Sequence, residues 1–193
     1  MAIKSGLTGR GFGLVSVAAV LGGVCVMVSA CDGPWLQTSG GEGGGDAAPP
    51  AAASKDFKHA LSDDVSGYYQ PASPVVVGKY RLTHIFLGQG AAFEGWEKGD
   101  KRSAYGPVMF EFEDGAGDVV RVKPRSYDVS ESHIRFTGHA ESVGDVSFNG
   151  QMDQGALATA RRNLGEETPV LSGTLSVGGR SFGVQKFRWY GGD

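Results

Sequence analysis

The four histidines of the chain are its most versatile candidates for acid–base catalysis or metal binding, because imidazole titrates near neutral pH and ligates transition metals. They are His59, His84, His133 and His139. No two of them have the spacing of an HxH or HExxH motif. His133 and His139 flank a predicted strand, so their side chains would lie about 20 Å apart. We therefore expect no metal site, and we expect His84 to be a hydrogen-bonded residue of the core or its rim.

The sequence also gives little indication of catalysis by a nucleophile or by paired carboxylates. The chain has no GxSxG or SxxK motif to mark a nucleophilic serine. Glu111, Glu113 and Asp114 cluster on one predicted hairpin, but Glu111 is expected to lie opposite Arg121, so a solvated strand face accounts for them. We predict that the protein is not an enzyme and has no catalytic residues and no cofactor. A hydrolase that uses His84 with a nearby carboxylate is the counter-hypothesis.

Composition and charge exclude several classes of protein. The chain has 193 residues, of which 32 are glycine, and 40% of them are hydrophobic and 20% charged. It is too apolar for a disordered protein and lacks the period-three glycine of collagen. The formal net charge of -3 is spread without long runs, so no nucleic-acid partner is expected. The glycine-rich residues 88–95 lack the lysine of a phosphate-binding loop and are predicted to be a connection.

The N-terminal segment has the features of an export signal. Lys4 and Arg10 precede an apolar run over residues 14–28, which is shorter than the roughly 20 residues that a transmembrane helix needs. The run ends in Val28-Ser29-Ala30-Cys31, which resembles the lipobox of bacterial lipoprotein signal peptides. The resemblance implies that residues 1–30 are removed and that Cys31 carries fatty acyl chains such as palmitate. An ordinary secretory peptide or an uncleaved anchor is the alternative.

The residues after the lipobox predict where the protein is held. Asp32 resembles the retention signal of lipoproteins in the inner membrane of enteric bacteria. The resemblance implies a lipid anchor in the inner rather than the outer membrane, with the protein facing the periplasm. The Gly-, Pro- and Ala-rich residues 31–55 are expected to be a disordered linker with an r.m.s. reach of roughly 25 Å. Residues 56–193 are then a single β-rich domain, tethered to the membrane through Cys31.

Alternating apolar residues predict strands in the first half of this domain. Residues 74–88 are expected to form one half-buried strand, with Leu82, His84 and Phe86 on the same face as Tyr80. Residues 107–122 are predicted to form a hairpin. Its apolar residues must share a face, and a three-residue loop Gly115-Ala116-Gly117 satisfies this condition and places Glu111 opposite Arg121.

The second half of the domain contains strands and one helix. Residues 132–138 and 145–152 alternate in polarity and are predicted to be strands. Residues 153–165 have apolar side chains at helical spacing, including Leu164, with Asp153 as the N-cap. Residues 170–190 are predicted to form a hairpin that turns at Gly178-Gly179, with a bulge near Gln185-Lys186. A short helix over residues 54–61 is also expected.

These elements predict a mainly β fold, a small antiparallel β-barrel or β-sandwich with one short helix inserted before the C-terminal hairpin. Aromatic residues in expected loops and strand ends are the candidates for a binding surface, because such residues anchor interfaces. They are Tyr68, Tyr69, Phe93, Trp96, Trp189 and Tyr190.

Two functions are compatible with this arrangement. The first is a cell-envelope lipoprotein whose tethered β-domain is a non-enzymatic interaction or assembly module with a protein partner in the envelope. The alternative is a β-barrel that binds a small apolar or amphipathic ligand in its aromatic interior. The interior candidates are Phe86, Phe110, Phe112, Phe136 and Phe148.

Overall fold

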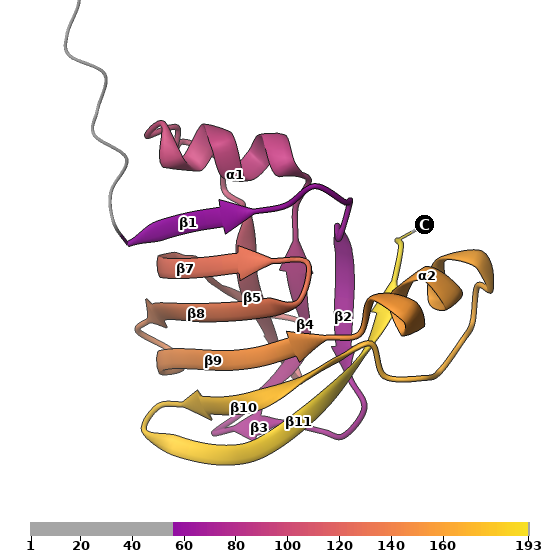
Figure 1. Ribbon diagram of the computed structural model, residues 1–193. Coiled ribbons are helices and arrows are strands. Elements are labelled where there is room, and N and C mark those ends of the chain that lie inside the picture. The colour runs from indigo at the N-terminus through magenta and orange to yellow at the C-terminus, as the bar shows by residue number, and fades with distance from the viewer. Residues whose placement is uncertain (1–55, 193) are drawn as a thin grey trace, which may run out of the picture. The chain divides into compact units, whose positions relative to one another are not determined.

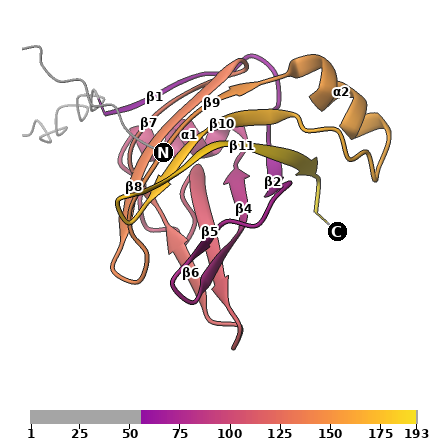
Figure 2. The same cartoon turned by 90° about the horizontal axis from the view of Figure 1, so that it is seen from below.

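The computed structural model describes residues 56–192, which form the mainly β fold that the sequence predicts. One mixed sheet of eleven strands curls strongly into a half-barrel and is joined by two short helices (Figures 1 and 2). The strands are β1 (Phe57–Ala60), β2 (Gly67–Pro71), β3 (Val76–Val77), β4 (Tyr80–Leu87), β5 (Val108–Asp114), β6 (Val119–Val122), β7 (Pro124–Ser130), β8 (His133–Ala140), β9 (Gly144–Met152), β10 (Leu171–Val177) and β11 (Arg180–Tyr190). The helices are α1 (Gly90–Glu97) and α2 (Gln154–Arg162).

The strand order of the sheet is β1-β7-β8-β9-β10-β11-β2-β4-β5-β6, and β3 pairs with β4 beside this path. All pairs are antiparallel except β1 with β7. The helix predicted over residues 54–61 is wrong, because β1 forms there. Its pairing with β7 outweighs the weak local helical pattern, and the more buried positions alternate, with Phe57 and His59 less exposed than Lys58 and Ala60.

The core lies inside the curl and includes a cluster of aromatic rings among its aliphatic side chains. The Phe110 ring lies 4.7 Å from Phe136 and 5.7 Å from Phe148, measured between ring centroids. Helix α1 adds Phe93 and Trp96, both buried in the same core. The sequence predicts only a connection at this helix. A short helix with two large apolar side chains forms instead, because it packs both of them into the core.

Two paired glycines allow the strands in the middle of the sheet to approach closely. Gly150 of β9 lies opposite Gly173 of β10, and both are buried. A Cβ on Gly173 would lie 2.4 Å from Gly150 Cα and 2.5 Å from the carbonyl oxygen of Asn149. The Phe148 ring fills the space on the core side, because a Cβ on Gly150 would lie 2.5 Å from its edge. Only glycine fits both positions beneath this ring.

Both predicted hairpins form with the expected turns. In β5–β6, Glu111 pairs with Arg121, and Gly117 in the loop adopts a φ of +86°. In β10–β11, Gly178 and Gly179 turn the chain with φ values of +58° and +79°, which only glycine adopts readily. Strands β8 and β9 also cover the residues that the alternating pattern indicates.

The predicted face of residues 74–88 is wrong in its second half. The chain turns at Gly78, so this segment forms β3 and β4 rather than one strand. An irregularity in the pairing of β4 with β5 between Leu82 and His84 then reverses the faces of the strand. Ile85 is therefore buried in the core, whereas His84 and Phe86 point to the outer face of the sheet.

The bulge of the last hairpin also lies earlier than predicted. Ser176 pairs with Ser181 and Thr174 with Val184, so one residue of β10 faces the two residues Phe182 and Gly183 of β11. Gly183 has a φ of +66°, which explains why the extra residue is accommodated there and not at Gln185-Lys186.

Helix α2 begins as predicted but ends early. The carboxylate of Asp153 accepts a hydrogen bond of 2.9 Å from the backbone N–H of Ala156, which confirms the N-cap. The helix ends at Arg162, so Leu164 is 87% exposed instead of facing the core.

Candidate functional site

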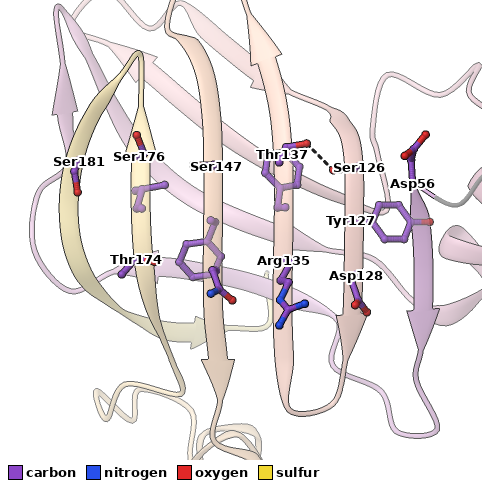
Figure 3. Close-up of a pocket in the computed structure, with 14 residues that line it drawn as sticks. Asp56, Ser126, Tyr127, Asp128, Arg135, Thr137, Ser147, Thr174, Ser176 and Ser181 are labelled. Carbon is purple, nitrogen blue, oxygen red and sulfur yellow. Dashed lines mark hydrogen bonds between the residues drawn. The ribbon is translucent and has the colours of Figure 1, made fainter. Parts of the chain in front are cut away.

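A row of five hydroxyl groups crosses the outer face of strands β7 to β11 (Figure 3). Each residue of the row is the direct cross-strand partner of the next. We call this set the hydroxyl row; it consists of Ser126, Thr137, Ser147, Ser176 and Ser181. Strands lie about 4.8 Å apart, so the row spans roughly 19 Å. The core-facing residues of the same strands, such as Phe136 and Phe148, are buried on the opposite side of the sheet.

A second row runs parallel to the hydroxyl row, two residues away on β7 to β10, and four of its five side chains are polar. Asp128 of β7 pairs with Arg135 of β8, Arg135 with Asn149 of β9, and Asn149 with Thr174 of β10. The fifth position of this row is Val184 of β11, which is 67% exposed. The two rows together present hydroxyl, amide, carboxylate and guanidinium groups on one surface.

The hydroxyl row and the polar residues of the second row line a shallow hollow of about 680 Å³. Residues from all five strands contribute to it, and Asp56, the first described residue, lies at its edge (Figure 3). The hollow therefore extends across the strands rather than along any one of them. A strongly twisted sheet is saddle-shaped, so even its outer face is concave along one direction. This shape explains why a hollow forms on the face opposite the core.

Most polar groups in the hollow have no partner within the described part of the chain. Ser126 and Thr137 share a hydrogen bond of 2.6 Å, and Asp128 lies 3.2 Å from His133. The side chains of Ser147, Asn149, Thr174, Ser176 and Arg135 form no hydrogen bond or ion pair with residues 56–192. These side chains can bond a ligand without first breaking an internal contact.

A contrasting surface lies on the other half of the sheet. Tyr190 of β11 pairs with Tyr68 of β2, Tyr68 with Phe86 of β4, and Phe86 with Met109 of β5. The Tyr68 ring lies 5.5 Å from Phe86 and 6.4 Å from Tyr190. We call Tyr68, Phe86 and Tyr190 the aromatic row; Met109 continues it on β5 and is buried. Its rings lie on the outer face, where Tyr190 is 40% exposed.

Two pockets lie on either side of Phe86 and extend the surface around the aromatic row. One, of about 670 Å³, is lined by Trp96 and by Tyr105, whose ring lies 6.3 Å from Phe86. The other, of about 480 Å³, is lined by Tyr68 and Trp189. Aromatic side chains with an adjacent pocket are the usual anchors of protein interfaces.

His84 lies beside the aromatic row and has no partner for one ring nitrogen. Its ring packs edge-on against Tyr68 at 4.9 Å, and its Nε2 is buried without a hydrogen bond. The nearest carboxylate oxygen, on Glu111, is 4.0 Å away, and the other oxygen of Glu111 accepts a bond of 2.8 Å from Arg121. Burial lowers the pKa of His84; Glu111 opposes this shift, and Arg121 adds to it. His84 is a neutral rim residue, and this geometry pairs it with no nucleophile.

The structure separates the six aromatic residues predicted to form a binding surface. Tyr69 and Phe93 are fully buried in the core, and Trp96 is 5% exposed. Trp189 is half-buried, and its indole N–H donates a hydrogen bond of 3.0 Å to the carbonyl oxygen of Ser66. Tyr68 and Tyr190 belong to the aromatic row. The core takes up Phe93 and Trp96 because helix α1, which forms where the sequence predicts a connection, turns both inward.

The described residues offer no metal or membrane-spanning feature. Within residues 56–192, no group of three or more His, Cys, Asp or Glu side chains could hold a metal ion. No helix in this range is long and apolar enough to cross a bilayer. Cys31 and Asp32, with the predicted signal peptide and linker, lie outside the described residues.

No family model, curated protein or solved structure matches this chain.

The hydroxyl row is absent from the sequence-based candidates, although it carries a recognisable signal. Short polar residues occupy the outward positions of residues predicted as strands, for example Ser147 and Asn149 around Phe148. What the sequence does not show is the register that aligns these positions across five strands. The aromatic row was predicted in part: Tyr68 and Tyr190 are among the sequence-based candidates, whereas Phe86 was expected inside. The irregularity in β4 turns Phe86 outward.

Proposed function

We propose that the protein is a cell-envelope lipoprotein, anchored through Cys31, whose β-domain is a non-enzymatic interaction module for a protein partner. The observation that carries this proposal is the aromatic row. Tyr68, Phe86 and Tyr190 lie outside the core on adjacent strands; the first two are partly buried and Tyr190 is exposed. Partly exposed aromatic residues on a paired sheet fit the anchor residues of protein interfaces.

The surroundings of the aromatic row also support a protein partner. Arg121 lies over the Tyr105 ring at 5.0 Å and pairs with Glu111, so charged groups border the rings. An apolar centre with a polar rim is the usual anatomy of an interface.

The apolar-ligand barrel is less well supported by the described residues. Of its interior candidates, Phe86 lies on the outer face. Phe110, Phe136 and Phe148 contact one another in the core. No observation on residues 56–192 favours this alternative over the interaction module.

Site-specific crosslinking in the cells that encode the protein tests the proposal. A photoreactive amino acid is placed at Tyr105, which is 51% exposed, and at Leu164, an exposed apolar control outside the row. We expect one discrete adduct with a second polypeptide from position 105 and none from position 164. Phe86→Ala should weaken the adduct, because loss of an anchor ring typically costs at least tenfold in affinity. Equal labelling from both positions, or no adduct at 105, would contradict the proposal.

A further inference from the structure

We propose that the hollow over β7–β11 binds a linear carbohydrate chain laid across the strands. This inference concerns a surface separate from the aromatic row and does not depend on the protein partner. It rests on the spacing of the hydroxyl row, the chemistry of its neighbours and the shape of the hollow.

The spacing of the hydroxyl row suits an extended sugar polymer. The five hydroxyls repeat at the distance between strands, about 4.8 Å, which is close to the advance per unit of an extended β-1,4-linked hexopyranose chain. Because the row spans roughly 19 Å, it matches about four sugar units. The hollow follows the row from Ser126 to Ser181, so the ligand would lie perpendicular to the strands (Figure 3).

The chemical character of the hollow fits a polyhydroxylated ligand. A serine or threonine hydroxyl both donates and accepts hydrogen bonds, as sugar hydroxyls do. Asp128, Arg135 and Asn149 add planar groups that can bond two adjacent sugar hydroxyls at once. Outside the lining, Val184 presents an exposed apolar side chain next to Thr174, on which the C–H face of a sugar ring can rest.

The charge of the hollow favours a ligand with little net charge. Two carboxylates, Asp56 and Asp128, and one guanidinium, Arg135, line it. A polyanion such as nucleic acid would require an excess of cations, which the lining does not supply. A protein partner would be expected to use aromatic anchors, and among the outward-facing residues that line this hollow none is aromatic.

The site is also preorganised. Apart from Arg135, the groups on its strands are short side chains, so little rotamer freedom is lost when a ligand binds. The Ser126–Thr137 hydrogen bond of 2.6 Å fixes two of the five hydroxyls.

Calorimetric titration of the full chain, held in a detergent without sugar groups, tests this inference. The ligands are cellotetraose and chitotetraose, which are β-1,4-linked and extended, with the α-linked maltotetraose as a control. We expect millimolar or tighter binding of at least one extended tetraose, and at least tenfold weaker binding of maltotetraose. Affinity should rise from the disaccharide to the tetrasaccharide and then level off, because the row spans about four units.

Three variants locate the binding site. Ser147→Ala and Ser176→Ala should each weaken binding by about fivefold, the effect of one lost hydrogen bond. Ser142→Ala removes an exposed hydroxyl from the β8–β9 turn, outside the hollow, and should leave the affinity unchanged. Circular dichroism confirms that each variant is folded.

Several results would overturn the inference. They are the absence of heat with both extended tetraoses at millimolar concentration, equal binding of maltotetraose, and equal weakening by Ser142→Ala. Because the crosslinking at Tyr105 reports on the other half of the sheet, failure of the carbohydrate site and failure of the interaction module can be distinguished.

Discussion

Gly173→Ala should destabilise the domain more than any other single added methyl group discussed here. The new Cβ would lie 2.4 Å from Gly150 Cα and 2.5 Å from the carbonyl oxygen of Asn149, both backbone atoms of the neighbouring strand. Comfortable contacts between carbon atoms are about 3.5–4.0 Å, so β9 and β10 must separate by roughly 1 Å. Cζ of Phe148, 2.7 Å away, blocks relief on the core side.

The expected magnitude follows from the cost of overpacking. Extra methyl groups in packed cores cost about 1–3 kcal/mol, and the upper end applies because backbone atoms cannot change rotamer. For a domain of this size, about 3 kcal/mol corresponds to a fall in Tm of roughly 10 °C. Thermal unfolding of the full chain, followed by circular dichroism, measures this change.

Gly95→Ala is the matched control for this prediction. A Cβ at Gly95 meets no atom within 4 Å, and the residue lies inside helix α1. Alanine is favoured over glycine in a helix by about 1 kcal/mol, so this variant should unfold at an equal or higher temperature. A Gly173→Ala protein that unfolds at the wild-type temperature would refute the close approach of β9 and β10.

Three further predictions concern titratable groups. Asp114→Ala should lower the hydrogen-exchange protection of the β6 amides, because this carboxylate pairs with Lys79 at 2.7 Å and accepts bonds from two N–H groups of the loop; unchanged protection would contradict it. The pKa of His84 lies below its usual range because of burial. Lowering the pH from 7 to 5 should therefore reduce the free energy of unfolding of the wild type more than that of His84→Gln. A smaller reduction in the wild type than in the variant would contradict the burial of this side chain. Hydrogen bonds from the hydroxyl and the backbone N–H of Ser62 lower the pKa of Glu131 to about 2. The stabilisation that the Glu131 carboxylate provides should therefore disappear as the pH falls from about 4.5 to 2. The stability of Glu131→Gln should not show this part of the pH dependence.

Local chemistry explains which parts of the fold the sequence predicts. The hairpins β5–β6 and β10–β11 follow from glycines at turn positions and from the requirement that apolar residues share a face. Helix α2 follows from its N-cap Asp153 and its apolar spacing. These features are set by neighbours in the chain, so a single sequence carries them.

The errors arise where distant contacts decide the structure. Strand β1 exists because it pairs with β7, and the sequence pattern of residues 54–61 carries no information on that partner. The irregularity between Leu82 and His84 depends on the pairing with β5 and reverses the outward residues of β4. Both candidate surfaces depend on cross-strand register, which explains why the alternation within single strands did not indicate them.

Native mass spectrometry of the protein released from its own membranes in mild detergent tests the central claim most directly. Wild type, Cys31→Ala and Phe86→Ala are compared. The account predicts acyl mass on the wild type and its absence from Cys31→Ala. It also predicts a stoichiometric second polypeptide on the wild type that Phe86→Ala weakens or loses. A wild-type protein without acyl mass would contradict the lipid anchor, and one that carries a ligand of a few hundred daltons in place of a polypeptide would contradict the interaction module.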